Sequence, residues 1–298
     1  MSTLTSIVAA TDLSGSSAHA SHRAACLAQM HQTQLTLVHV LAASALDELR
    51  RADDAASAHV VEDDARSRLH ALALELGQRH ELPVAEQLRT GHPMQEIVRL
   101  ADELNADLVV TGTRGAGLMR GVVVGSTAER IARFTRRPVL MVRQSVHEPF
   151  RRVLVPVDFS PWSLEAARLA VRIAPEATVV LMHAVEVPFE RRMRSSGVTD
   201  QAITRSRAHL RAEAQRKLGE LAAQTGLAPE RLRQSITEGD DPWILIAQQE
   251  QEHDCDLIVM GRQGRHALEE LMLGSTTTKV VAECSADVLL SIHRTAKP

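Results

Sequence analysis

The 298-residue chain contains no tyrosine, two tryptophans and four phenylalanines, so aromatic residues make up only 2% of it. Proteins that bind RNA or single-stranded DNA without sequence preference stack the bases on aromatic side chains. The formal net charge is −3, which gives no electrostatic reason to bind a polyanion. We therefore expect neither a nucleic acid nor an acidic membrane surface as a partner.

Cysteines and long apolar runs are also scarce. The three cysteines, Cys26, Cys255 and Cys284, have no short spacing and indicate neither a disulfide framework nor a zinc knuckle. We expect buried thiols in a reducing compartment. No apolar run approaches the ~18 residues of a membrane span, and the first residues, MSTLTSIVAATDLS, lack the pattern of a secretion signal. The expected location is the cytoplasm.

The sequence contains the same pattern twice. SIVAATDLS at 6–14 aligns with RVLVPVDFS at 152–160, and LTLVHV at 35–40 aligns with VVLMHA at 179–184. Self-similarity with only two copies indicates a duplicated domain rather than a solenoid. We place the two domains at residues 1–145 and 150–298, joined by a polar stretch that contains Pro149.

Within each half, short apolar runs alternate with longer amphipathic segments. The expected strands are SIVAAT, LTLVHV, VAEQLR, LVVTG and PVLMVR in the first half, and VLVPVD, VVLMHA, LRQSIT, DLIVMG and ADVLLSI in the second. Helices are expected over 16–30, 46–80, 94–104 and 126–136, and in the same order in the second half. This alternation predicts an α/β fold: two tandem doubly wound five-stranded parallel-sheet domains, Rossmann-like or flavodoxin-like, related by a pseudo-two-fold axis.

A glycine-rich segment follows the fourth apolar run of each half: TGTRGAGLMRGVVVGST at 111–127 and MGRQGRHALEELMLGST at 260–276. Aligned without gaps, the two segments share five of seventeen positions. The shared residues are Gly112, Gly115, Gly125, Ser126 and Thr127 in the first half, and Gly261, Gly264, Gly274, Ser275 and Thr276 in the second. The segment is neither a Walker A loop, because it lacks the G-K-S/T ending, nor the dinucleotide fingerprint, because it does not follow the first strand.

The shared residues are those that a phosphate-binding loop needs. Glycine lacks a Cβ, so the backbone can turn sharply and approach an oxygen closely. The last glycine of each segment opens a helix, whose free N–H groups and positive dipole end suit an anion. The hydroxyls add donors there, or equally serve as helix N-caps. Because ligands of open α/β sheets lie beyond the carboxyl ends of the strands, we expect a phosphate site at this edge.

Two polar positions end neighbouring strands at the same edge. Asp12 and Asp158 follow the first strand of each half, where a carboxylate can accept from a ribose hydroxyl, position a divalent ion, or cap the next helix. His39 and His183 end the second strand, and we expect them to be structural. Asp12 with His39 is a weak candidate for a zinc site, and no other metal site is expected.

The glycine segment after the fourth strand, with an aspartate after the first, resembles the ATP-binding type of universal stress protein in its tandem form. The resemblance covers essentially the whole chain. It implies that the strand-one segment P-x-D, and the residue after the strand-two histidine, contact the nucleotide. These residues are Ala10, Asp12 and Val40 in the first half, and Pro156, Asp158 and Ala184 in the second. The family pattern is broken at Ala10, and at Ala184, which offers less apolar contact to an adenine.

The resemblance also implies a ligand and a role. The ligand is ATP, or else ADP or AMP, with Mg²⁺, and the role is nucleotide-dependent stress response or signalling. Family members associate through the last strand, which implies either a homodimer or an intrachain pseudo-dimer through PVLMVR and DVLLSI. Arg120 in the first glycine segment aligns with Glu269 in the second, which favours the first half as the stronger site.

Catalysis has little support in the sequence. We find no nucleophile elbow, no adenylyl-transfer signature and no base beside the glycine segment, so we expect at most slow ATP hydrolysis. Two alternatives to a nucleotide-binding module stay open. One is a slow metal-dependent ATPase, and the other is a degenerate pair of domains that binds another small ligand, zinc or a protein partner.

Overall fold

The computed structural model describes residues 4–44, 47, 55–113, 125–145, 148–185, 199–239, 241–264 and 273–292. The strands of the first half are β1 (Ser6–Ala10), β2 (Gln34–Ala42), β3 (Val84–Gly91), β4 (Leu108–Gly112) and β5 (Val139–Val142). Its helices are α1 (Gly15–His31), α3 (Ala55–His80), α4 (Pro93–Glu103) and α5 (Ser126–Phe134). The predicted alternation of strand and helix is confirmed.

The second half repeats this order. Its strands are β6 (Arg152–Pro156), β7 (Thr178–Val185), β8 (Leu232–Glu238), β9 (Leu257–Gly261) and β10 (Asp287–Ser291). Its helices are α6 (Pro161–Ile173), α8 (Asp200–Ala223), α9 (Pro242–Glu252) and α10 (Ser275–Glu283), with a 3₁₀ turn at Pro229–Arg231.

The predicted helices 16–30 and 94–104 agree with α1 and α4 to within one residue at each end. Of the predicted helix 46–80, the structure describes Asp47, which is helical, and α3 from Ala55 onward; residues 46 and 48–54 lie outside the described residues. The predicted helix 126–136 was too long, because α5 ends at Phe134. Thr135 has extended backbone angles (φ −70°, ψ 150°), and Pro138 follows, which disfavours helical geometry in the residue before it.

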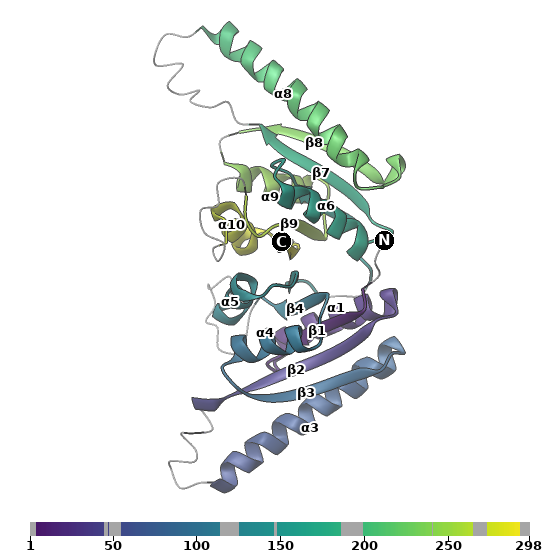
Figure 1. Ribbon diagram of the computed structural model, residues 1–298, viewed down its shortest axis with the longest axis vertical. Helices are drawn as coiled ribbons and strands as arrows, with labels where there is room; N and C mark the ends of the chain where they lie inside the picture. The colour runs from purple at the N-terminus through teal and green to yellow at the C-terminus, as the bar shows by residue number, and fades with distance from the viewer. Residues whose placement is uncertain are drawn as a thin grey trace, which may run out of the picture.

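The ten strands form one sheet in the order β3-β2-β1-β4-β5-β10-β9-β6-β7-β8. Neighbouring strands are parallel within each half, in the 3-2-1-4-5 order of the Rossmann fold rather than the flavodoxin order. The two halves meet at their last strands, where β5 and β10 pair antiparallel. The predicted pairing of PVLMVR with DVLLSI within the chain is therefore confirmed, and it produces the elongated molecule of Figure 1.

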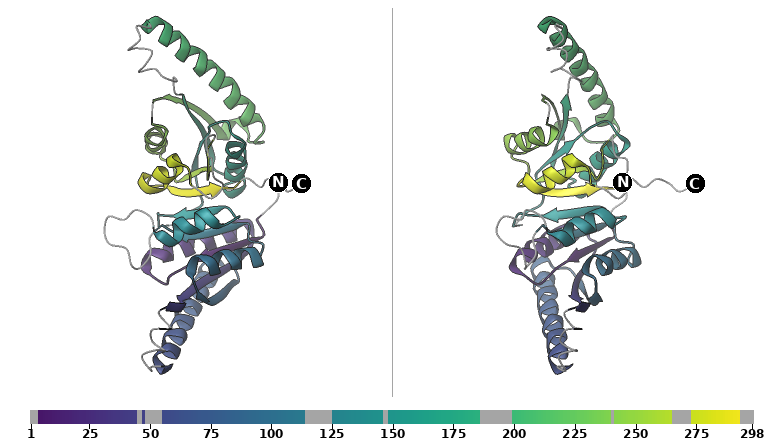
Figure 2. Two further views of the ribbon diagram at one scale, coloured as in Figure 1. Left: turned by 60° about the vertical axis from the view of Figure 1, so that its left-hand side comes forward. Right: turned by 90° about the vertical axis from the view of Figure 1, so that its left-hand side faces the viewer.

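Helices cover both faces of this sheet, which explains why the strands are apolar on both sides. All five residues of β1 and of β10 are buried. One cluster of buried residues packs α1, α3, α6 and α8 on one face, and a second packs α4, α5, α9 and α10 on the other. Both clusters include residues of both halves, so the core is continuous across the β5–β10 join. The two halves and their helices are seen from two further sides in Figure 2.

A buried ion pair crosses this join. The Arg23 Nε of α1 lies 3.0 Å from Oδ2 of Asp287 at the start of β10, and their side chains are 5% and 0% exposed. The second oxygen of Asp287 accepts hydrogen bonds from the backbone amides of Arg143 and Gln144. Burial raises the pKa of Asp287, and the Arg23 guanidinium and the two amides oppose that rise. The Arg23 guanidinium also lies 4.0 Å above the ring of Phe150.

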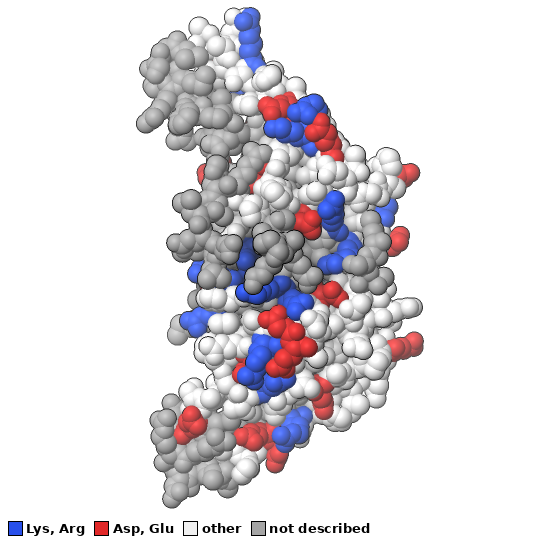
Figure 3. Space-filling model, viewed as in Figure 1, with Lys and Arg blue, Asp and Glu red and all other residues white. Residues whose placement is uncertain are grey.

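The remaining global expectations concern thiols, membranes and charge. Cys255 and Cys284 are buried and Cys26 is half-buried; burial raises the pKa of all three thiols, to about 12 for Cys255 and Cys284. Within the described part of the chain, the helices are all too short or too polar to cross a membrane. Basic and acidic side chains are interspersed over the described surface that Figure 3 shows.

Breaking the buried ion pair should strongly destabilise the protein. Asp287→Asn leaves the Arg23 charge buried without its counter-charge, and we expect the free energy of unfolding to fall by about 3 kcal/mol in urea titrations. Arg23→Met combined with Asp287→Asn removes both charges, keeps an acceptor for the two amides, and should restore most of the loss. Asp254→Asn, which removes the exposed partner of Arg152, serves as the control and should cost under ~1 kcal/mol. A double variant less stable than Asp287→Asn would contradict this account.

Candidate functional site

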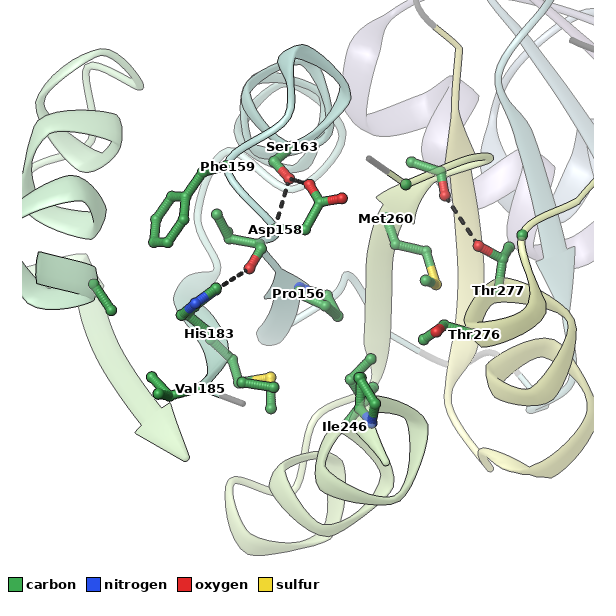
Figure 4. Close-up of a pocket in the computed structure, with 18 of the residues that line it drawn as sticks. Pro156, Asp158, Phe159, Ser163, His183, Val185, Ile246, Met260, Thr276 and Thr277 are labelled. Atoms are coloured by element: carbon green, nitrogen blue, oxygen red, sulfur yellow. Dashed lines mark hydrogen bonds between the residues drawn. The ribbon is translucent and has the colours of Figure 1, made fainter. Parts of the chain in front are cut away.

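A pocket of about 750 Å³ opens at the carboxyl ends of β6, β7 and β9 (Figure 4). β7 lies on one side of β6 and β9 on the other, so the strand order reverses at this point. Ligands of open α/β sheets usually bind where the strand order reverses. The strands separate there, since β6 and β9 pair through Val153 and Leu154 only, whereas β1 and β4 pair over four residues. Pro156 has no N–H to continue the ladder, and it lines the opening.

All eight site residues predicted for the second half line this one pocket. They come from β6, β7, β9 and α10 and from the turns that follow β6 and β9: Pro156, Asp158, Ala184, Gly261, Gly264, Gly274, Ser275 and Thr276. The close-up shows Phe159 and His183 on one side, Thr276 and Thr277 on the opposite side, and Ile246 of α9 between them. Pro156 and Thr276, 120 positions apart in the chain, thus line one pocket because of the strand order.

The glycine segment is closed at its base in both halves. The amide of Gly274 donates to the carbonyl of Arg262 at 3.1 Å, and the amide of Gly125 donates to the carbonyl of Thr113 at 2.7 Å. Each of these bonds brings the end of the segment back to its beginning, so the following helix starts beside the end of β9 or β4.

A glycine, not a hydroxyl residue, occupies the N-cap of each of these helices. Gly125 precedes α5 and Gly274 precedes α10, and within the described residues no side chain caps either helix. The alternative that Ser126, Thr127, Ser275 and Thr276 serve as N-caps is therefore wrong, because the serines occupy the first helical position. The first turn of α10, with Ser275 and Thr276, faces the pocket instead.

The three glycines of the second segment are needed for different reasons. A Cβ on Gly261 would lie 2.9 Å from both the Gln263 carbonyl oxygen and the Trp162 Cβ, closer than atoms pack. A Cβ on Gly264 would lie 3.1 Å from Oδ2 of Asp158. A Cβ on Gly274 would meet nothing closer than 3.5 Å. Gly261 is thus required by packing, while Gly264 and Gly274 keep the pocket wall open.

The two aspartates take part in the start of the following helix. Oδ1 of Asp158 accepts from the amide and hydroxyl of Ser160 and from the hydroxyl of Ser163, at 2.5–3.0 Å. Oδ1 of Asp12 accepts from the amide and hydroxyl of Ser14. Both carboxylates are therefore held in a fixed orientation, and Asp158 lines the pocket.

The two histidines bridge neighbouring strands. Nδ1 of His39 lies 2.9 Å from the Thr11 carbonyl oxygen, and Nδ1 of His183 lies 2.6 Å from the Val157 carbonyl oxygen. A carbonyl only accepts, so Nδ1 carries the proton in both rings. This bond gives each histidine the expected structural role. In the described residues no group of three or more His, Cys, Asp or Glu side chains is arranged to hold a metal ion.

Sequence reasoning missed part of the pocket wall. The ring of Phe159 packs against that of His183 with centroids 4.3 Å apart, and Lys217 of α8 lies 5.9 Å from the Phe159 centroid. Lys217 forms an ion pair with Glu213, and both line the pocket. A signal existed, since the matching helix of the first half carries another acid–base pair one turn apart, Asp64 with Arg68.

The first half places its candidates in the same relation. Ala10 ends β1, Val40 lies in β2, and Gly112 ends β4 beside β1. Gly125, Ser126 and Thr127 form the start of α5, and Asp12 follows β1. Gly115, Arg120 and Glu269 lie outside the described residues.

Comparisons with known proteins cover both halves. The sequence profile described as the universal stress protein family matches residues 3–143 and 149–291. A universal stress protein of Mycolicibacterium smegmatis is 25% identical over 95% of this chain and 96% of its own length. The crystal structure of a universal stress protein from Archaeoglobus fulgidus has a TM-score of 0.69 at 19% identity, and covers 96% of this chain and 97% of its own. A putative universal stress protein from Pseudomonas aeruginosa has a TM-score of 0.65 at 19% identity, over 96% and 92% of the two chains.

The packing of the glycines predicts unequal effects of adding one methyl group. Gly261→Ala should lower the free energy of unfolding by about 1–3 kcal/mol, because Trp162 and the backbone at Gln263 must move. Gly274→Ala is the matched control, and should change stability by under ~1 kcal/mol since its Cβ meets ordinary contacts. Thermal unfolding followed by circular dichroism checks both variants, and equal losses would contradict this assignment of roles.

Proposed function

This chain belongs to the universal stress protein family, and we propose that it is a tandem adenine-nucleotide-binding module. In this proposal each of the two domains, residues 1–145 and 150–298, holds one nucleotide with Mg²⁺. The bound nucleotide acts as a ligand that favours one conformation or assembly in stress signalling, and not as a substrate that is rapidly turned over.

One observation carries the proposal. The eight second-half residues that the sequence pattern singles out line a single pocket of about 750 Å³. This volume lies within the usual range of ~300–1,000 Å³ for small-molecule sites. The wall combines an apolar part, which includes Pro156, Met260 and Ile246, with a polar part formed by the start of α10. Such a division suits a ligand with a flat apolar ring at one end and a phosphate group at the other.

The residues fit a nucleotide in chemical terms. Ser275 and Thr276 begin α10, and its N-cap residue is Gly274. Their amides and hydroxyls would hold the phosphates. Asp158, fixed by its serine donors, would accept from a ribose hydroxyl or help to hold the divalent ion. Ala184 would face the adenine. In the first half the corresponding roles fall to Ser126 and Thr127, to Asp12, and to Val40.

The site supports binding better than catalysis. Nδ1 of His183 is committed to the Val157 carbonyl, and Asp158 accepts several hydrogen bonds, so neither is arranged as a general base for an attacking water. Bound ATP would then hydrolyse slowly at most. The rival proposal, a metal-dependent ATPase, requires turnover that EDTA stops and that Asp12→Asn or Asp158→Asn abolishes.

Nucleotide released from the purified protein tests the proposal directly. We expect chromatography of freshly denatured protein, or of protein first incubated with Mg-ATP, to yield up to two equivalents of adenine nucleotide per chain. Gly274→Val should remove the second-site equivalent, with at least a tenfold rise in Kd, because the added methyl groups enter the pocket next to Thr277. Gly125→Val should do the same at the first site.

A matched control separates loss of the site from loss of the fold. Gly219 lies in α8 with nothing within 4 Å of an added Cβ, so Gly219→Val should bind as the unaltered chain does. A chain that carries no nucleotide, and binds none in calorimetric titration with Mg-ATP, would sink the proposal. The glycine segments would then be an inherited structural feature.

A further inference from the structure

Two arginines cross from one half of the molecule to the helix that begins at the other half's candidate site. Arg262 directly follows Gly261 in the second half. Its Nη1 donates to the carbonyls of Ala132, Arg133 and Thr135, at 3.5, 3.0 and 3.0 Å, at the carboxyl end of α5 in the first half. Conversely, Arg143 of the first half donates through Nη2 to the carbonyls of Val281 and Ala282 at the carboxyl end of α10.

Each arginine supplies what the end of the helix needs. A helix ends with unsatisfied carbonyls and a partial negative charge, which a cation stabilises. The last turn of α10 contains no basic residue of its own. The last turn of α5 contains Arg133, but that side chain is engaged 2.6 Å from Glu129. The cations that complete both helix ends therefore come from the opposite half of the chain.

Both arginines are joined by the backbone to the glycine segments. The carbonyl of Arg262 accepts from the amide of Gly274, the bond that closes the second segment, while its side chain reaches α5. Arg143 follows Val142, whose carbonyl accepts from the amide of Thr113, and Thr113 closes the first segment through Gly125. Each arginine thus connects the base of one glycine segment to the helix that starts at the other.

The helices are short enough to transmit this effect. α5 and α10 have nine residues each, and their amino ends are the candidate anion sites. They lie on the same face of the sheet, on either side of the β5–β10 join (Figure 1). Because such a helix is only about 13 Å long, a displacement of its carboxyl end moves its first turn as part of one rigid unit.

We propose that Arg262 and Arg143 are positioning residues that link the two nucleotide sites, each acting on the site of the opposite half through the helix whose end it binds. The inference rests on the proposed function. Nucleotide bound at the base of one glycine segment would hold the adjoining arginine, and with it the helix of the other site. The two sites would then bind with positive coupling, and this coupling is reciprocal by linkage.

The blocking substitutions isolate one site at a time and leave the glycines of both segments unchanged. Ala184→Trp fills the second pocket from β7, and leaves the first site to be titrated with Mg-ATP by calorimetry. In this background, Arg262→Met should raise the Kd of the first site about two- to fivefold, because α5 loses the side chain that holds its carboxyl end. Arg136→Met is the matched control, because Arg136 is exposed beside the same helix end and makes none of the three bonds. It should leave the Kd unchanged.

The reciprocal arm uses Val40→Trp to fill the first site. In this background, Arg143→Met should raise the Kd of the second site to a similar extent. Arg262→Met should affect the second site only through the second glycine segment, to which Arg262 belongs. Arg262→Lys keeps the charge but not the three-carbonyl reach, and should recover part of the affinity lost with methionine. If Arg262 only stabilised the fold, Arg262→Met would lower the melting temperature, and Arg262→Lys would not recover part of the lost affinity.

The outcomes are distinct. A higher Kd of the first site in Arg262→Met, or of the second site in Arg143→Met, supports the coupling if the Arg136→Met control leaves the Kd unchanged. Nucleotide binding that is intact and unchanged in both Arg262→Met and Arg143→Met overturns the inference and leaves the proposed function standing. A chain that binds no nucleotide in either background, and none without the blocking substitutions, overturns both.

Discussion

The antiparallel pairing of β5 with β10 is the contact on which the rest of the molecule depends. Both strands are short and buried on both faces, and three residue pairs join them. Separated, each would be an apolar sheet edge with unpaired backbone groups and no cover, which is unfavourable in water. Once they are paired, the two sheets become one, and two helical layers and two continuous cores extend across the join.

The join is nearly symmetric, and its asymmetry is informative. Arg23 and Asp287 form the buried ion pair, but the positions that correspond to them in the duplicated pattern are Leu169 and Pro138. The pair is therefore made once, on one side of the pseudo-two-fold axis. A buried ion pair contributes little net stability but penalises arrangements in which its charges are unpaired. Here it favours the pairing of the two halves in one arrangement. The arginines that reach α5 and α10 add polar contacts on the opposite face of the same join.

Much of the candidate site follows from local rules that a sequence reader can apply. Apolar runs of four to eight residues with amphipathic segments between them predicted the strands and helices. Since the strands are parallel, their carboxyl ends meet at one edge, which brings Asp158 near Gly261 and Gly274 without knowledge of any contact. The cap was predicted less well. Serine is a favoured N-cap, yet Gly274 takes that place, and its amide closes on the Arg262 carbonyl directly before α10 begins. Lys217 and Phe159 were missed because their approach depends on how α8 lies over the sheet.

The sequence by itself determined the duplicated α/β architecture, the strand edge that carries the site, and the residue types offered there, because periodicity and glycine spacing act over short stretches of chain. Only the tertiary structure decided the strand order, the opening between β6 and β9, and the partners of Asp287, Arg143 and Arg262. Those partners lie more than a hundred residues away along the chain. No local pattern encodes them, since they arise when two sheets share an edge and the helix ends of one half come within reach of the other.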